Sequence, residues 1–204
     1  MNSTMRAACA ALLAALLAAC AALQPPRFEY PKLYLLDARA DPATPSAQRD
    51  LVLAVEAPRA HPGYATAQMA YVRAPYRIDY YAHNRWVDTP AHMLAPLLVE
   101  ALAQSGAFRA VLRAPSPAAA DLRLESELVR LQQDFSAQPS RVQLTLRAQL
   151  LDAKADKVLA TRLFDALETA PSEDARGGAI AANRALARVL GEIVEFCRAA
   201  AAGD

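Results

Sequence analysis

Cys20 is the residue whose surroundings predict the most specific chemistry. It follows Leu17, Ala18 and Ala19, which is the order of a lipobox: a branched apolar residue and two small residues precede a cysteine. The small side chains let a signal peptidase approach the peptide bond, and the Cys20 thiol is the nucleophile that receives diacylglycerol. We therefore expect Cys20 to become the lipidated first residue of the mature protein.

The segment before Cys20 has the composition of an export signal. Arg6 supplies a positive charge, and the apolar run from Ala7 to Leu17 has the length that a signal peptide needs. That run is shorter than the roughly 20 residues of a membrane-spanning helix. Residues 1–19 are therefore predicted to be a lipoprotein signal peptide. The alternative is an ordinary cleavage site between small residues, with Cys20 present by chance.

The residues after the cysteine predict where the mature protein is held. Ala21 stands where an aspartate would retain a lipoprotein in the inner membrane of enteric bacteria, so we expect the periplasmic face of the outer membrane. Residues 20–31 contain Gln24-Pro25-Pro26 and are predicted to form an extended, lipidated tether. A single folded domain is expected over residues 32–204.

The other residues that could support catalysis or metal binding are scattered. The histidines are His61, His83 and His92, and none has a partner histidine at the i+3 or i+4 spacing of a helical metal pair. Convergence of His83 and His92 with Asp79 or Asp88 after folding stays open. Neither a nucleophile elbow nor a phosphate-binding glycine loop is present in the sequence. We expect no enzymatic activity, no metal and no cofactor.

Cys197 and two arginines of the last predicted helix allow two interpretations each. Cys197 is the only cysteine left once Cys9 and Cys20 are accounted for, so it forms no internal disulfide. Its helical position favours a small buried residue over a reactive thiol. Arg184 and Arg188 lie one turn apart and could bind phospholipid head groups, but a solvated polar face is the expected role.

The nearly neutral net charge argues against nucleic acid as a partner, and the hydrophobic content is high enough for a folded core. The formal net charge is +1, from 22 Lys and Arg against 21 Asp and Glu, and loss of Arg6 with the signal leaves about zero. A neutral chain lacks the basic footprint of a nucleic-acid-binding protein. A hydrophobic content of 54% and a length of 204 residues suit one domain. Homo-oligomerisation stays open.

Hydrophobic periodicity predicts an α/β fold. Strands are expected over residues 32–37, 51–55, 68–73, 77–82, 108–113, 121–134, 140–152 and 157–167. Helices are expected from Thr89 to Gly106 and from Pro171 onward, each with one apolar stripe. Pro96 implies either a kink or a regular helix that begins only near His92. The predicted architecture is a single domain: a mixed, mainly antiparallel sheet with two main helices packed on it.

One stretch of the predicted sheet is rich in aromatic residues. It holds five of the seven tyrosines and the only tryptophan: Tyr64, Tyr71, Tyr76, Tyr80, Tyr81 and Trp86. Such side chains combine apolar area with a polar group, which suits interfaces. We expect Tyr71, Tyr80 and Trp86 to pack between sheet and helix. Tyr76, Tyr81 and Arg85 are the predicted partner-binding residues, and Tyr81 is expected to be the exposed tyrosine of its strand.

Several motifs occur in an order that resembles a known family. They are Tyr34-Leu35-Leu36-Asp37 in the first strand, the Tyr71 to Tyr81 hairpin, Trp86 before Pro90, Ser105-Gly106-Ala107-Phe108, Ala120-Asp121 with Leu124, and Leu150-Leu151-Asp152. With the lipobox, this order resembles the ABC-type transport auxiliary lipoprotein family, whose best-known type belongs to the paraquat-inducible intermembrane transport system. The resemblance covers nearly all of the mature chain.

The resemblance implies a function that the residues alone do not. It implies a lipid-anchored periplasmic partner of an MCE-domain protein and of an ABC permease and ATPase, in a system that moves lipids between membranes. It also implies an α/β domain similar to the anticodon-binding-like fold. The alternative hypothesis is a periplasmic lipoprotein that carries a lipid in its own pocket.

Overall fold

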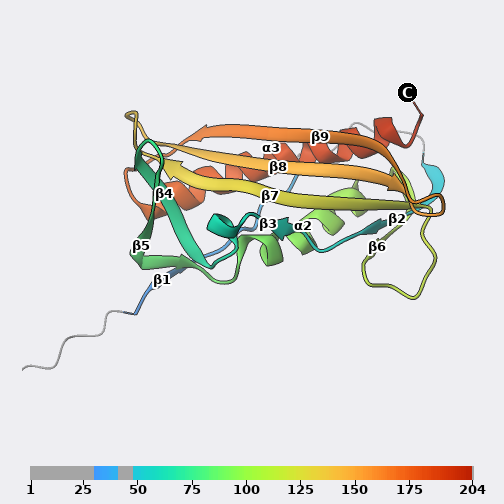
Figure 1. Ribbon diagram of the computed structural model, residues 1–204, viewed down its shortest axis with the longest axis horizontal. Helices are drawn as coiled ribbons and strands as arrows, with labels where there is room; N and C mark the ends of the chain where they lie inside the picture. Colours follow the sequence, from blue (N-terminus) through green and yellow to red (C-terminus); the bar gives the residue numbers. More distant parts are fainter. Residues whose placement is uncertain (1–29, 41–47, 204) are drawn as a thin grey trace, which may run out of the picture. The chain divides into compact units, whose positions relative to one another are not determined.

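The computed structural model describes residues 30–40 and 48–203 (Figure 1). The predicted signal peptide, Cys20, most of the tether and residues 41–47 lie outside the described residues. The folded domain begins at Pro31 and forms one compact unit. None of the helices in the described part of the chain is long and apolar enough to cross a membrane.

The described strands form one sheet centred on β7 (Leu122–Asp134). One side of β7 pairs along its length with antiparallel β8 (Arg141–Asp152), which pairs in turn with antiparallel β9 (Lys157–Thr169). The other side of β7 accepts three short parallel strands in succession. They are β2 (Arg49–Val55), β3 (Arg59–Ala60) and β4 (Gln68–Ala74). The sheet is therefore mixed, with its longest pairings antiparallel, as predicted.

Three further strands and a short helical turn complete this side of the molecule. β5 (Arg77–Trp86) pairs antiparallel with β4, and the short β1 (Lys32–Tyr34) pairs parallel with the end of β5. β6 (Phe108–Arg113) pairs parallel with β2. A 3-10 turn, η1 (Pro62–Tyr64), lies between β3 and β4.

Two helices cover one face of the sheet. α2 (Pro90–Gln104) is capped by the Thr89 hydroxyl, which accepts a hydrogen bond from the His92 N–H at 3.4 Å. Because α2 is helical from Pro90 and contains Pro96, a start near His92 is wrong. The second helix, α3 (Ala175–Ala200), is capped by Asp174 and runs along β8 and β9 (Figure 1).

The core lies between this face and the two apolar helical stripes. Leu128, Leu146 and Phe164 of the three long strands are at most 1% exposed, and the α3 stripe from Leu186 to Cys197 is buried as predicted. On the opposite face, most alternate residues of β7 and β8 are charged or polar and at least partly exposed, although Thr145 and Leu151 are buried. This is the pattern of an antiparallel sheet that is wet on one side.

β1 is shorter than predicted, because the chain leaves the sheet after Tyr34 and crosses to α3. Asn183 of α3 holds the extended segment from both sides: its amide donates to the Leu35 carbonyl at 3.0 Å and accepts from the Asp37 N–H at 2.8 Å. Leu36 between them is only 4% exposed. A side chain of α3 thus satisfies the backbone groups that a neighbouring strand was expected to satisfy.

Strand directions define two ends of the sheet. The hairpin end holds the β4–β5 turn, the β7–β8 loop and the start of α3; the turn end holds the β8–β9 turn, the β6–β7 loop and the end of α3 (Figure 1). β4 runs parallel to β7, whereas β5 and therefore β1 run against it. The chain consequently enters β1 from the side of the hairpin end.

Candidate functional site

The β4–β5 hairpin carries most of the aromatic residues and ends in a protruding tyrosine. Ala74 pairs with Arg77, so Pro75 and Tyr76 form the turn. Tyr76 has a φ of 63°, in the left-handed region, and its side chain is fully exposed. This backbone conformation is unfavourable for a bulky residue by about 1–2 kcal/mol. The turn therefore holds an aromatic ring outside the domain, where it is accessible to a partner.

Behind the tip, three aromatic rings pack in tilted and edge-to-face contacts, and an arginine lies over two of them. The Tyr71 ring lies 4.8 Å from Tyr81 and 5.9 Å from Phe135 of the β7–β8 loop, measured between centroids. The guanidinium of Arg73 lies 5.2 Å from the Tyr71 centroid and 5.5 Å from that of Phe135, within range of a cation–π interaction. These contacts join the hairpin to the neighbouring loop and give its tip a rigid base.

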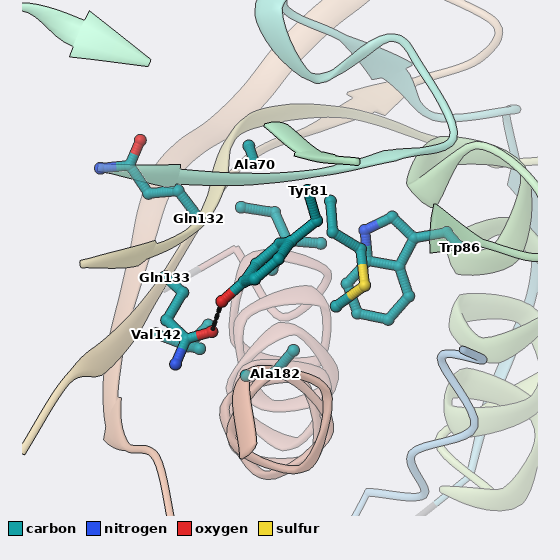
Figure 2. A pocket seen from close by; sticks show the side chains of 10 residues that line it. Ala70, Tyr81, Trp86, Gln132, Gln133, Val142 and Ala182 are labelled. Carbon is teal, nitrogen blue, oxygen red and sulfur yellow. Dashed lines mark hydrogen bonds between the residues drawn. The ribbon is translucent and has the colours of Figure 1, made fainter. Parts of the chain in front are cut away.

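Tyr81 points into the domain, where it begins a polar network (Figure 2). Its hydroxyl donates to Gln133 Oε1 at 3.0 Å, and Gln133 Nε2 donates to the Ser140 hydroxyl at 2.9 Å. The Ser140 N–H donates to Glu173 Oε1 at 2.9 Å, just before α3. Gln133 is 3% exposed and Ser140 is fully buried. Burial, and then the charge of Asp174, raise the pKa of Tyr81 above its usual value.

The expectation of an exposed Tyr81 is therefore wrong, although the predicted alternation is right. Tyr80 and Tyr81 do lie on opposite faces: the Tyr80 hydroxyl donates to the Gly63 carbonyl at 2.9 Å, while Tyr81 contacts Gln133. Both rings are half-buried, because η1 covers the outer face of the hairpin and α3 covers the inner face. The Tyr64 hydroxyl of η1 donates to Gln132 Oε1 at 2.6 Å.

Only a small void lies beside Tyr81. It measures about 10 Å³ and is bordered by Met69, Trp86, Val142 and Ala182 (Figure 2). That is room for about one water molecule, against the several hundred cubic ångströms of a typical ligand pocket. Trp86 is 3% exposed and packs in the core, as expected.

The close approach of α3 to this network depends on a glycine. A Cβ atom at Gly178 would lie 2.2 Å from Gln133 Oε1, far inside contact distance. Neither Gln133 nor Gly178 was predicted from the sequence. A glycine inside an apolar helical pattern was the available signal, since such a residue often marks a close contact.

Arg85 lies in an apolar surface patch where β5 pairs with β1, on the edge of β5 away from β4. It pairs with Leu33 in the β1–β5 register, and Leu33, Leu35 and Val87 are 59%, 52% and 49% exposed. Leu33 and Arg85 are register partners, and Leu35 and Val87 follow just beyond the ends of the two strands. We call this surface the β1 patch. Arg85 itself is exposed, so the patch combines apolar area with a cation that can donate several hydrogen bonds.

The three predicted partner-binding residues thus do not form one surface. Arg85 lies opposite Gln68, six residues along β4 from Ala74 at the tip, a separation of about 20 Å. Tyr76 projects at the tip, Arg85 lies in the β1 patch, and Tyr81 lies between them and faces inward. The structure separates two exposed contact candidates from one supporting residue.

Two of the three histidines, His61 and His92, each pair with one carboxylate. His61 Nε2 lies 3.4 Å from Glu127, which also binds Arg147 at 2.8 Å, and His92 Nδ1 lies 3.4 Å from Asp88. In residues 30–40 and 48–203, no group of three or more His, Cys, Asp or Glu side chains is arranged to hold a metal ion.

The remaining candidates lie on α3. Cys197 is fully buried, and burial raises the pKa of its thiol to about 12. Arg188 binds Glu168 at 2.8 Å. Arg184 instead borders an open surface groove of about 580 Å³, whose lining consists of Tyr34, Arg176, Ala179, Ile180, Asn183, Arg184 and Ala187.

Fold and surface together define a class: an α/β domain with a filled interior, whose candidate contacts are a protruding hairpin and an apolar edge. The model of the ABC-type transport auxiliary lipoprotein component family matches residues 34–194, and the chain belongs to this family. Family membership indicates a membrane-anchored protein of the cell envelope that is associated with an ABC-type transport system.

Solved structures share the fold. The chain is similar to protein XCC0632 from Xanthomonas campestris, with a TM-score of 0.77, 24% identity, and coverage of 84% of this chain and 97% of that one. An uncharacterized protein is similar with a TM-score of 0.65, 15% identity, and coverage of 82% and 99%. The lipoprotein GNA1162 from Neisseria meningitidis is a more distant match, with a TM-score of 0.38, 13% identity, and coverage of 76% and 99%. No match was found among curated proteins.

Proposed function

We propose that this chain is the accessory, protein-binding lipoprotein of an MCE/ABC-type intermembrane lipid transport system, anchored through Cys20 at the periplasmic face of the outer membrane. The observation that carries the proposal is the contrast between surface and interior. The β1 patch exposes Leu33, Leu35 and Val87 around Arg85, whereas the void beside Tyr81 holds about 10 Å³. A filled domain with an apolar surface patch suits docking better than transport of a lipid within it.

Within this proposal the β1 patch is the contact surface for the MCE-domain protein. Exposed aliphatic side chains around an arginine have the composition of an interface centre, where a few residues provide most of the binding free energy. Tyr81 supports this surface from inside, because its hydroxyl fixes β5 to Gln133 of β7. The role requires neither catalysis nor a cofactor, and we propose none.

The test is binding of the full-length lipoprotein to the MCE-domain protein of its own system. Arg85→Ala is expected to lower the affinity roughly 5- to 30-fold, equivalent to about 1–2 kcal/mol. Arg59→Ala is the matched control, because Arg59 is also an exposed strand arginine and lies in β3, away from the patch. Equal affinities for wild type and Arg85→Ala would remove the patch from the proposal, and no binding by wild type would remove the partner.

Self-association is proposed through the opposite edge of the sheet. β9 pairs with β8 alone among the described strands, and Leu163 and Leu167 on it are 55% and 46% exposed. A free strand edge with apolar side chains is a template for pairing with another chain. Leu163→Lys is expected to shift the mass measured by light scattering toward the monomer. A monomeric wild type would exclude this contact.

One observation supports the alternative, a lipid carrier. The α3 groove has an apolar floor of Ala179, Ile180 and Ala187 between Arg176 and Arg184, a combination that suits an acyl chain and its phosphate. Native mass spectrometry of the Cys20→Ser protein separates the two functions. If the Cys20→Ser protein binds one phospholipid and the additional substitution Ile180→Asp abolishes that binding, the lipid-carrier function would replace the docking function.

A further inference from the structure

The chain enters the domain at the end where the hairpin protrudes. β1 runs parallel to β5, and β5 runs against β4, so the start of β1 and the end of β4 point to the same end of the sheet (Figure 1). Lys32 pairs with Asn84, next to the pairing of Arg85 with Gln68. The tip lies six residues farther along β4, about 20 Å away along the strand.

The length of the tether sets an upper limit on the distance between the start of β1 and the membrane. Residues 20–31 span at most about 40 Å when fully extended. The entry point and the tip lie at the same end of the sheet, about 20 Å apart along β4, so a tether of this length allows the tip to reach the head-group layer of the membrane that holds Cys20.

The chemistry of the tip suits that layer. Tyr76 is fully exposed at a φ of 63°, and exposed Arg73 and Arg77 flank it. Tyrosine is enriched at membrane–water interfaces, and arginine binds lipid phosphate through paired N–H donors. Arg73 has no carboxylate partner among the described residues; it lies over Tyr71 and Phe135, whereas Arg77 binds Asp79 at 3.0 Å.

We propose that the β4–β5 tip docks on the phospholipid head-group layer of the membrane that holds the lipid anchor. Tyr76 enters the interface, and Arg73 and Arg77 contact lipid phosphates. The inference rests on the proposed lipidation of Cys20. Its consequence is a second attachment point, which orients the domain and holds the β1 patch at a fixed height above the membrane.

The experiment uses the full-length lipoprotein in vesicles of phosphatidylethanolamine and phosphatidylglycerol, with or without bromine on the acyl chains. Tyr76→Trp places a fluorescent reporter at the tip, and the buried Trp86 contributes a constant background. The matched control is Val158→Trp, because Val158 is 46% exposed and lies beside the turn at the opposite end. Emission from Tyr76→Trp is expected to shift to shorter wavelength and to be quenched by brominated lipid, with no change for Val158→Trp.

Flotation of the same samples separates failure of the inference from failure of the anchor. Vesicles that carry the protein while both reporters stay unquenched would overturn tip docking and leave the anchor intact. A wild-type chain that does not float would remove the anchor and, with it, the inference. A spectral shift of Tyr76→Trp that appears only when the MCE-domain protein is added would assign the tip to a protein partner and overturn membrane docking.

Discussion

The hairpin end and the turn end of the same sheet are stabilised by different kinds of contact. At the hairpin end, Tyr81, Gln133 and Ser140 form a buried network against α3, and Tyr76 projects beyond it. At the turn end, exposed ion pairs join the loops: Lys154 binds Asp121 at 2.7 Å and Arg123 binds Asp156 at 2.7 Å. Buried polar contacts fix geometry far more firmly than exposed charges do.

The difference indicates which end is built for a contact. A side chain held in a left-handed backbone conformation persists only where its surroundings determine it. The packed rings of Tyr71, Tyr81 and Phe135 provide that support behind Tyr76. In the β8–β9 turn the left-handed residue is Asp156, whose φ of 50° is easily tolerated by an aspartate. The hairpin end thus combines rigidity with exposed aromatic area.

The largest expected effect distinguishes the base of the hairpin from its tip. Trp86→Ala removes an indole that is 3% exposed and should lower the free energy of unfolding by about 3 kcal/mol. Tyr76→Ala removes a fully exposed ring and should leave stability unchanged, because the ring is not buried and alanine keeps the Cβ atom that disfavours the left-handed backbone. Urea unfolding of both variants measures the difference. Equal losses would mean that the tip packs within the fold.

Two glycines of α3 give the next test, one toward each end. Gly178→Ala would force its Cβ against the buried Gln133 amide and should destabilise the protein by about 2 kcal/mol. Gly191→Ala meets no atom within 4 Å and should stabilise the helix by about 0.5–1 kcal/mol. Thermal unfolding of the pair should therefore show shifts of opposite sign. A gain for both would indicate that Gln133 moves aside without cost.

Local pattern predicted the long elements of this fold, because their signals are local. Alternation located β7, β8 and β9, and the Thr89 cap located the start of α2, whereas α3 begins at Ala175, four residues after the predicted start at Pro171. The parallel partners of β7 were not predicted as such, because β2, β3 and β4 join it from far along the chain and β3 has only two residues. The hydrophobic pattern of a single segment does not show which distant segment it pairs with.

The candidate site shows the same limit at the level of single residues. Alternation placed Tyr80 and Tyr81 on opposite faces, but their exposure depends on η1 and α3, which cover those faces. The pairing of β5 with β4 is also irregular. Gln68 pairs with Arg85 and Ala70 with Tyr80, so a step of two residues in β4 corresponds to five residues in β5, and simple alternation does not hold across this bulge. Tyr76 was predicted more easily, since an X-Pro-Tyr turn between two strands projects from any sheet.

The N-cap of α3 adds a pH-dependent contribution at the hairpin end. The Gly177 N–H and the Ser172 hydroxyl donate to Asp174 at 2.7 Å each, and they hold the pKa of its carboxyl below the ordinary value of 3.8. Because the pKa of this carboxyl is lower in the folded protein than in the unfolded chain, its ionised form stabilises the fold at pH values above the unfolded-state pKa. This stabilisation is lost as the pH falls through the folded-state pKa. Asp174→Ala should lower stability by about 1 kcal/mol at neutral pH.

The difference between wild type and Asp174→Ala should then narrow as the pH falls below about 4, where the unfolded carboxyl takes up its proton. Chemical unfolding at a series of pH values measures this. A difference that stays constant down to strongly acidic pH would mean that the ionised form of Asp174 contributes nothing to the cap.

The smallest effect is expected at the turn end, for Lys154→Ala. The Lys154 side chain is 75% exposed, and its partner Asp121 also accepts the Val52 N–H at 2.9 Å. Because that backbone contact survives the substitution, the turn keeps its anchor, and exposed ion pairs contribute little on their own. The unfolding midpoint should match that of wild type in both low and high salt, since the lost pair is already weakened by solvent. A midpoint lowered as far as that of Asp174→Ala would break the comparison between the two ends, because it would show an exposed ion pair stabilising the fold as strongly as a helix cap does.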